Sequence, residues 1–476
     1  MVVIVVAVLA LPFVVGASRR RAVSPPVTLD LHRSFAVTDH AILDGFSFER
    51  VMNSLVERSG APGMTATRLY QQWFDTLNPK PGLIAADASH CDDFLIDGKP
   101  SFNGFPRHCP APEGSLATAK PFVPPQFFPL AIINRFDMTA SDGSNCGQYR
   151  LIYARQPTEN VTVPEGPLSI DTLHVIFEAV LPNPKPESGL AGCRPVAQFW
   201  ADLSAVASIA ERRARLEEFF FTGLAGFAPV IQPENLSRTT GGGVRSFHWS
   251  GTAGGNPQFY QFRLEKTCDG AGCRLLMEPD VLQNTPFGKL FDATNRTPVG
   301  RRFRENFIEQ VKNLAIEDEN RFFMDLPREF LLAESDPVDG PPNYVFFIPY
   351  FSGLISPEGW EFERRISAEL KRVGSKRQPS EIIQRAASQT CFGCHVTAAL
   401  GGPLPIGQPF VLFQHVSERR VEQGEAGRRF SISPAMRDVF IPHRMEILRE
   451  FLTTNTPPVR SNSSAPQTIG GGRAVQ

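Results

Sequence analysis

The sequence predicts an α+β fold, with a disulfide-stapled mixed α/β N-terminal domain followed by a small all-α C-terminal domain. Three observations indicate this arrangement. Alternating β-branched and aromatic segments lie among amphipathic segments over the first three quarters of the chain. Six of the eight cysteines are spread over residues 91–273. A charged, polar stretch at 355–380 then separates this region from a shorter helical one.

Length and composition indicate a globular protein with more than one domain. The chain has 476 residues, of which 42% are hydrophobic. Its 48 basic and 49 acidic residues give a formal net charge of -1. Such a balance produces no overall field toward polyanions, so we expect no nucleic-acid partner.

The first 17 residues are predicted to be a signal peptide or an anchor. The apolar run at 2–15 is too short to span a bilayer comfortably. It ends in Val15, Gly16 and Ala17, small residues typical of a cleavage site. We therefore expect export to the periplasm or the extracellular space, with membrane contact only if this segment stays uncleaved.

Residues 28–370 are predicted to form the α+β domain, whose function the sequence does not indicate. Hydrophobic periodicity predicts helices at 47–60, 65–77, 196–224 (one or two) and 300–315. Strands are expected at 130–137, 147–155, 172–182, 257–266, 273–279 and 343–351. Proline- and glycine-rich sequence predicts a long surface loop at 79–128, and the glycine run at 239–246 reads as another loop.

Six cysteines are expected to form structural disulfides in an exported protein. Six cysteines allow 15 pairings in general. The simplest is sequential and joins Cys91 to Cys109, Cys146 to Cys193, and Cys268 to Cys273. The last pair would close a tight hairpin in the segment CDGAGC.

Five ionisable residues could share one side of the predicted sheet if their strands are neighbours. Strand alternation places them on common faces: Arg135, Asp137, Arg150, His174 and Glu178. Two interpretations remain open. The face could be a solvated one with ordinary cross-strand pairs, or it could line a polar pocket.

The segment CFGCH at 391–395 carries the only motif with a specific chemistry. On a helix, Cys391, Cys394 and His395 lie three and four residues apart and so share a face. A helix at 380–392, capped by Ser380, is expected to lead into it. Covalent haem c needs this arrangement, since each thiol joins one vinyl group and the histidine ligates the iron. A redox CxxC, half of a zinc site and a structural disulfide are the alternatives.

The features of residues 375–455 resemble a monohaem class I cytochrome c. A helix leads into the CxxCH motif, a proline-containing loop follows, and a closing helix is expected at 442–452. This resemblance implies one covalent haem in this domain, and residues 456–476 have the composition of a disordered tail. The segments INRFD, CGQYRLIYAR and VIFEAVLPNP also look like those of large exported bacterial proteins with one C-terminal CxxCH. That likeness implies export and haem but no substrate.

The second axial ligand decides between the functions. The resemblance places Met436 at the distal position, and His415 is the rival. Either would suit an electron carrier that works with a redox partner protein. With neither bound, an open iron site would suit a haem-dependent oxygenase or peroxidase with a small-molecule substrate. A third interpretation is a non-haem secreted binding or structural protein in which CFGCH is structural.

Overall fold

The computed structural model describes residues 28–454, except for 85–87, 124, 157–170, 251–256, 271, 319, 336–355, 396–414 and 426. It confirms the predicted fold class: a mixed α+β protein with a sheet-rich N-terminal region, a helical part and three disulfides. The N-terminal segment 1–17, the strand expected at 343–351 and the tail 456–476 lie outside the described residues.

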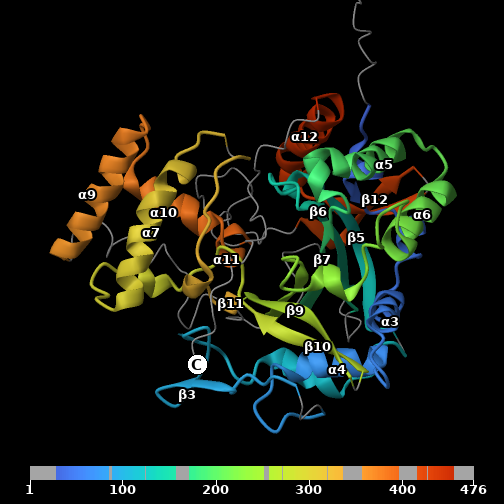
Figure 1. Ribbon diagram of the computed structural model, residues 1–476, viewed down its shortest axis with the longest axis horizontal. Helices are drawn as coiled ribbons and strands as arrows, with labels where there is room; N and C mark the ends of the chain where they lie inside the picture. Colours follow the sequence, from blue (N-terminus) through green and yellow to red (C-terminus); the bar gives the residue numbers. More distant parts are fainter. Residues whose placement is uncertain are drawn as a thin grey trace, which may run out of the picture.

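An eight-stranded antiparallel sheet forms the centre of the molecule (Figure 1). Its strands are β1 (Ala36–Val37), β5 (Phe127–Arg135), β6 (Asn145–Arg155), β7 (Asp171–Pro182), β8 (Gly243–Ser250), β9 (Pro257–Asp269), β10 (Gly272–Asp280) and β11 (Glu334–Ser335). The order is β1-β5-β6-β7-β8-β9-β10, and β11 pairs with β9. Neighbouring strands along most of the sheet are thus consecutive in the chain.

One face of the sheet packs against helices, and the two together form the main hydrophobic core. Three helices cover it: α3 (Phe48–Ser59), α4 (Ala66–Asp75) and α5 (Arg194–Ala205). Phe48 of α3 packs on Phe177 of β7, with ring centroids 5.9 Å apart. Trp200 of α5 stacks on Tyr149 of β6 at 5.6 Å. Since side chains alternate along a strand, the residues between these aromatic ones point to the opposite face.

The remaining helices and strands before residue 290 are short. They include α1 (Leu31–Ser34), α2 (His40–Leu43), α6 (Ile209–Glu217) and the strands β2 (Phe94–Ile96), β3 (Lys99–Phe102) and β4 (Phe105–Pro106). The last three form a small sheet inside the segment expected to be a loop. Asp97-Gly98 and Asn103-Gly104 all have positive φ, which suits two-residue hairpin turns. These two dipeptides make the segment a meander rather than a plain loop.

A second hydrophobic cluster holds the helices that lead to the CFGCH motif. They are α7 (Pro298–Leu314), α9 (Pro357–Arg372) and α10 (Pro379–Ser388), and the short helix α11 (Cys391–His395) follows them. The charged stretch at 355–380, which is predicted to separate two domains, contains α9. Its Phe362, Ile366 and Leu370 are four residues apart and all buried in this cluster, so the charged residues occupy the outer face of an amphipathic helix.

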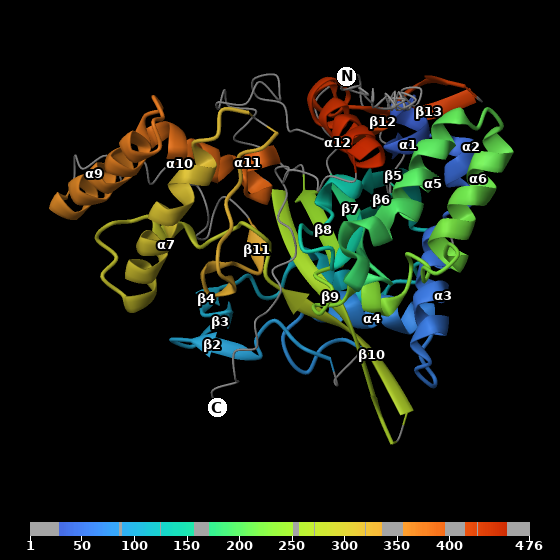
Figure 2. The ribbon, with the colours of Figure 1, turned by 45° about the horizontal axis from the view of Figure 1, so that its top comes forward.

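The C-terminal elements return to the first core (Figure 2). They are β12 (Val416–Gly424), β13 (Gly427–Ile432), a π-helical turn at Met436–Phe440 and α12 (Ile441–Thr454). The Phe430 amide donates to the Thr38 carbonyl at 3.1 Å, and Phe451 packs on Phe136 at 4.9 Å. The two ends of the predicted 375–455 unit therefore pack against different clusters, and its boundaries stay a prediction.

Three disulfides join the cysteines in the predicted sequential order. Their Cα atoms lie 5.5 Å apart in Cys91–Cys109, 5.1 Å in Cys146–Cys193 and 4.0 Å in Cys268–Cys273. This confirms the pairing, and disulfides of this kind favour an oxidising compartment. Within the described ranges, no helix has the length and apolar character needed to cross a membrane.

Candidate functional site

The helix that leads into the motif, α10, begins one residue before the predicted helix and ends four residues before its predicted end. Gln378, not Ser380, precedes the first turn of α10, and Pro379 takes the first position, which suits a residue without an N–H. The Glu381 carboxylate accepts a hydrogen bond from the backbone N–H of Gln378 at 2.6 Å. The helix stops at Ser388, so the continuous helix predicted over 380–392 is wrong.

A separate helical turn, α11, carries the two thiols. The Thr390 hydroxyl accepts from the Gly393 amide at 2.9 Å and donates to the Ala387 carbonyl at 2.8 Å. One side chain thus closes α10 and begins α11, because threonine can bond to backbone groups on both sides of it. The chain turns at this residue, and the turn directs Cys391 toward the central sheet.

A buried arginine holds α10 in place. The Arg385 side chain is only 2% exposed. It donates to the Leu314 and Ile316 carbonyls at 2.6 and 2.7 Å and lies 3.9 Å from the centre of the Phe322 ring. These bonds satisfy carbonyl groups at the end of α7, so the motif rests on a rigid pair of helices.

Replacing Gly393 by alanine should destabilise the protein. A Cβ atom at this position would lie 1.8 Å from the Ala387 carbonyl oxygen, so α11 would have to move off α10. We expect the free energy of unfolding to fall by about 1–3 kcal/mol in urea denaturation, as at other overpacked sites. Gly270→Ala is the matched control, because nothing lies within 4 Å of a Cβ there. Equal effects of the two changes would contradict the close contact.

Cys391 and Cys394 are the two cysteines that form no disulfide, and both are half-buried. Cys391 packs against an apolar patch on the sheet, made of Phe247, Phe259 and Leu282. The Thr285 hydroxyl hydrogen-bonds to its thiol. His395 is the last residue of α11, but its side chain lies outside the part that the structure describes.

The surroundings of the two thiols disfavour a redox CxxC. Burial raises the pKa of Cys391, although Arg245 acts in the opposite direction. Burial and the neighbouring Cys391 raise the pKa of Cys394 to about 12. Both thiols are therefore protonated at neutral pH. Thiols that exchange disulfides need a low pKa, because the thiolate is the nucleophile.

The sheet face beside the motif carries buried charges rather than a solvated polar surface. Glu178, on β7, is 3% exposed and lies between two arginines. Its carboxylate is 3.2 Å from Arg150 of β6 and 3.1 Å from Arg245 of β8. The two guanidinium groups outweigh the burial of Glu178 and hold its pKa below the usual value. Arg245 also donates to Gln261 of β9 at 3.1 Å.

Two further arginines extend this charged face toward β5. Arg135 pairs with Asp137 at 2.8 Å. Arg444, on α12, lies 3.9 Å from Asp137 and has an Nη1 atom with no hydrogen-bond partner among the described residues. Burial and the neighbouring Arg135 lower the pKa of Arg444 well below its usual value. Together with Arg150 and Arg245, four guanidinium groups face two carboxylates, which leaves a surplus of buried positive charge.

Of the five ionisable residues predicted for this face, four form the ion pairs described above: Arg135, Asp137, Arg150 and Glu178. The fifth, His174, lies on the same face. His174 is 7% exposed. Its Nε2 atom is 3.4 Å from Glu418 of β12, and its ring is 5.8 Å from that of Phe247. The sequence analysis missed Arg245, because the preceding glycines were read as a loop. The alternation of Val244 and Ser246 with Arg245 and Phe247 was the signal for this strand.

The two candidates for the distal ligand flank the β12–β13 hairpin in the chain. Met436 is 2% exposed and packs in the main core. His415 precedes β12, is half-buried, and has its ring 6.1 Å from that of Phe440. Phe440 in turn lies 6.0 Å from the Arg444 guanidinium. His415 is therefore linked by contacts to the charged face, while Met436 lies among the apolar side chains beneath α12.

The residues around the motif have the chemistry that a covalent haem requires. Two unpaired thiols share one face of α11, and Phe247 and Phe259 supply an apolar surface next to them. The surplus guanidinium groups suit the two carboxylates that every haem carries. A cluster of three or more histidine, cysteine or acidic side chains that could hold a bare metal ion does not occur in the described part of the chain.

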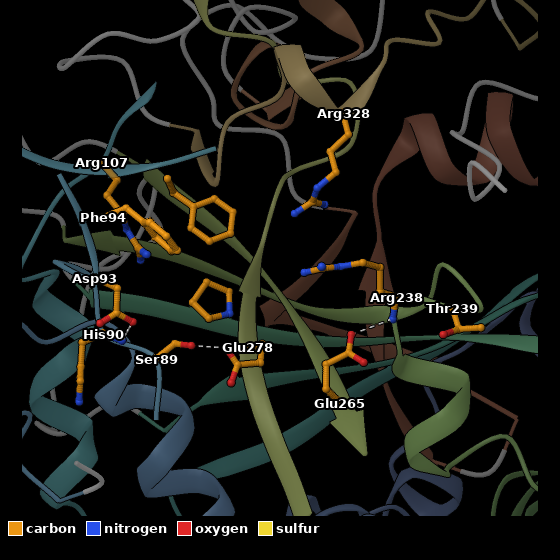
Figure 3. Close-up of a pocket in the computed structure, with 12 residues that line it drawn as sticks. Ser89, His90, Asp93, Phe94, Arg107, Arg238, Thr239, Glu265, Glu278 and Arg328 are labelled. Atoms are coloured by element: carbon orange, nitrogen blue, oxygen red, sulfur yellow. Dashed lines mark hydrogen bonds between the residues drawn. The ribbon is translucent and has the colours of Figure 1, made fainter. Parts of the chain in front are cut away.

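A cavity of about 800 Å³ opens on the same sheet face, further along β9 and β10 (Figure 3). Its lining includes Glu265 and Glu278, from these two strands. Glu265 follows Phe259 by six residues, so it lies about 20 Å further along the strand. The cavity and the motif are thus separate features of one surface.

Comparisons with known proteins give no match. No protein-family model matches the chain, and neither the curated proteins nor the solved structures contain one that is significantly similar to it.

Proposed function

We propose that the protein is an exported c-type monohaem protein that transfers electrons. The observation that carries the proposal is the pair of unpaired thiols at 391 and 394, set in CFGCH and turned toward a buried, arginine-rich face. Six cysteines form disulfides and these two do not. A bound haem would supply one-electron iron chemistry. The disulfides favour an oxidising compartment, in agreement with the predicted export to the periplasm or the extracellular space.

The residues named above would divide the work of holding the group. Cys391 and Cys394 would bind it covalently and His395 would ligate the iron, as the motif predicts. Arg150, Arg245 and Arg444 would neutralise its carboxylates. Arg444, whose Nη1 atom has no hydrogen-bond partner among the described residues, would then gain an anion, which offsets the desolvation of its charge.

The proposal is tested by expressing the protein together with a c-type haem maturation system. We expect the intact mass to exceed that of the polypeptide by one haem, and the haem to stay attached on a denaturing gel. A chain with no added mass would overturn the proposal. The remaining interpretation would then be a non-haem secreted binding or structural protein.

Replacing Met436 by leucine tests the distal ligand while keeping the volume of the core. If Met436 is the ligand, the oxidised protein should lose the weak far-red band of methionine–iron ligation and bind carbon monoxide faster. His415→Ala should leave that band unchanged. The opposite result, with His415→Ala opening the iron, would assign bis-histidine ligation. Both measurements use absorption spectra, and the oxidised wild-type protein is the reference.

A second candidate is a haem-dependent oxidoreductase, either an oxygenase or a peroxidase. An iron with neither Met436 nor His415 bound would favour it, since a substrate or dioxygen needs an open coordination position. High-spin iron in the wild type, with rapid binding of carbon monoxide, would support this function over electron transfer. A low-spin spectrum would instead favour a redox partner protein as the physiological partner.

A further inference from the structure

The cavity along β9 and β10 has a strongly cationic wall. Asp280 is 1% exposed and is the shared carboxylate of three arginines. Arg263 donates to it at 2.7 Å, Arg328 pairs with it, and Arg238 lies 3.6 Å away. One carboxylate cannot neutralise three guanidinium groups. Arg238 and Arg328 therefore keep hydrogen-bonding capacity for another anion.

The opposite side of the cavity supplies one more arginine and an apolar surface. Figure 3 shows Arg107 beside Phe94, across the cavity from Arg238 and Arg328. Arg107 is 8% exposed, and its Nε atom has no hydrogen-bond partner among the described residues. Its guanidinium lies 5.7 Å from the ring of Phe102. Phe94, at the rim, is 65% exposed, an unusual state for a large apolar side chain next to a cavity.

The acidic residues of the cavity do not cancel this cationic character. Asp93 pairs with Lys80 at 2.7 Å. Glu265 accepts from the Arg238 amide at 3.2 Å. Glu278 hydrogen-bonds to Ser89, and burial raises its pKa, which shifts it toward the neutral acid. These carboxylates thus already accept hydrogen bonds or form ion pairs, whereas the guanidinium groups of Arg107, Arg238 and Arg328 have unused donors.

We propose that this cavity binds a small organic acid with an apolar or aromatic body. The carboxylate would lie between Arg238 and Arg328, and the body would cover Phe94 and Phe102. The volume of about 800 Å³ is within the range of small-molecule sites. The site stands apart from the haem motif, so the inference goes beyond the proposed function and does not depend on it.

The test compares three probes on the full-length protein by isothermal titration calorimetry. Benzoate has both a charge and an apolar body, benzamide has the body alone, and acetate has the charge alone. We expect benzoate to bind at least about tenfold more tightly than either of the others, because the charge-assisted hydrogen bonds and the apolar contact each contribute. Equal affinity for benzamide or acetate, or no saturable binding of benzoate, would overturn the proposal.

Substitutions then locate the site. The double change R238Q and R328Q should weaken benzoate binding by about tenfold or more, since it removes the charges that face the carboxylate. Both side chains are partly exposed, at 42% and 35%, so the fold should tolerate the change. Arg364→Gln, in an exposed pair on α9, is the matched control and should leave the affinity unchanged. An unaltered affinity in the double variant would show that benzoate binds elsewhere.

Discussion

Replacing both Cys391 and Cys394 by alanine should abolish covalent haem attachment. No thiol would remain to join the vinyl groups, because the other six cysteines are all in disulfides. On a denaturing gel, the haem stain should fall from full intensity to background. Each single variant should keep at most one thioether and release part of its haem. A double variant that still carries covalent haem would exclude the motif as the attachment site.

The control for this experiment is the double change C268S and C273S. It also removes two cysteines, but it opens the disulfide at the end of the β9–β10 hairpin, which closes a loop of only 5 residues. A disulfide that closes a short loop reduces the entropy of the unfolded chain least. We expect this variant to fold and to stain for haem as strongly as the wild type. A loss of stain here would mean that attachment fails for reasons of folding, not for lack of the two thiols.

Glu178→Gln should cause the largest loss of stability of any single polar substitution considered. The change leaves Arg150 and Arg245 buried without the carboxylate that lies within about 3.2 Å of both. Breaking a buried ion pair by removing one partner costs about 3–5 kcal/mol. A loss of that size is a large part of the total stability of a typical domain. Urea denaturation at neutral pH measures it.

The control is Glu211→Gln, which removes an exposed carboxylate that pairs with Arg215 on α6. Such a pair contributes about 0.3–0.5 kcal/mol. The effect of Glu178 should also depend on pH. The pKa of Glu178 is lower in the folded protein than in the unfolded chain, so its contribution is present above the unfolded value of about 4.3. It is lost as the pH falls through the folded pKa. A cost below about 1 kcal/mol at neutral pH would contradict the central role of this carboxylate.

The strands with clear alternation could be predicted from the sequence, but β8, which follows a run of glycines, could not. Residues 147–155 and 172–182 coincide closely with β6 and β7, because their apolar side chains repeat every second residue. The strand β8 begins at Gly243, where a Cβ would lie 2.2 Å from Arg263. A glycine is required there by close packing, but in the sequence it reads as a turn. Neighbours in space decide such cases, and local propensity cannot register them.

The candidate site, too, could be predicted from the sequence only in part. Spacing alone was enough to single out Cys391 and Cys394, since both thiols share one helical face. The arginines around them come from β6, β8 and α12, three elements that are far apart in the chain. Strand alternation predicts that Arg150 and Glu178 share a sheet face, but no pattern in the sequence brings Arg444 to Asp137. That contact depends on the path of the chain after residue 415, which periodicity does not reveal.

The return of the C-terminal segment to the first core has a consequence for the order of assembly. Thr38 and Phe430 are joined by two hydrogen bonds, one from the Phe430 amide to the Thr38 carbonyl and one from the Thr38 hydroxyl to the Phe430 carbonyl, although they lie 392 positions apart in the chain. Synthesis releases the N-terminal strands first, and such distant contacts form slowly because they close a very long loop. The charged sheet face therefore stays uncovered on its α12 side until the last residues arrive. If haem is attached as proposed, Arg444 would join its site only after α12 has packed against this face.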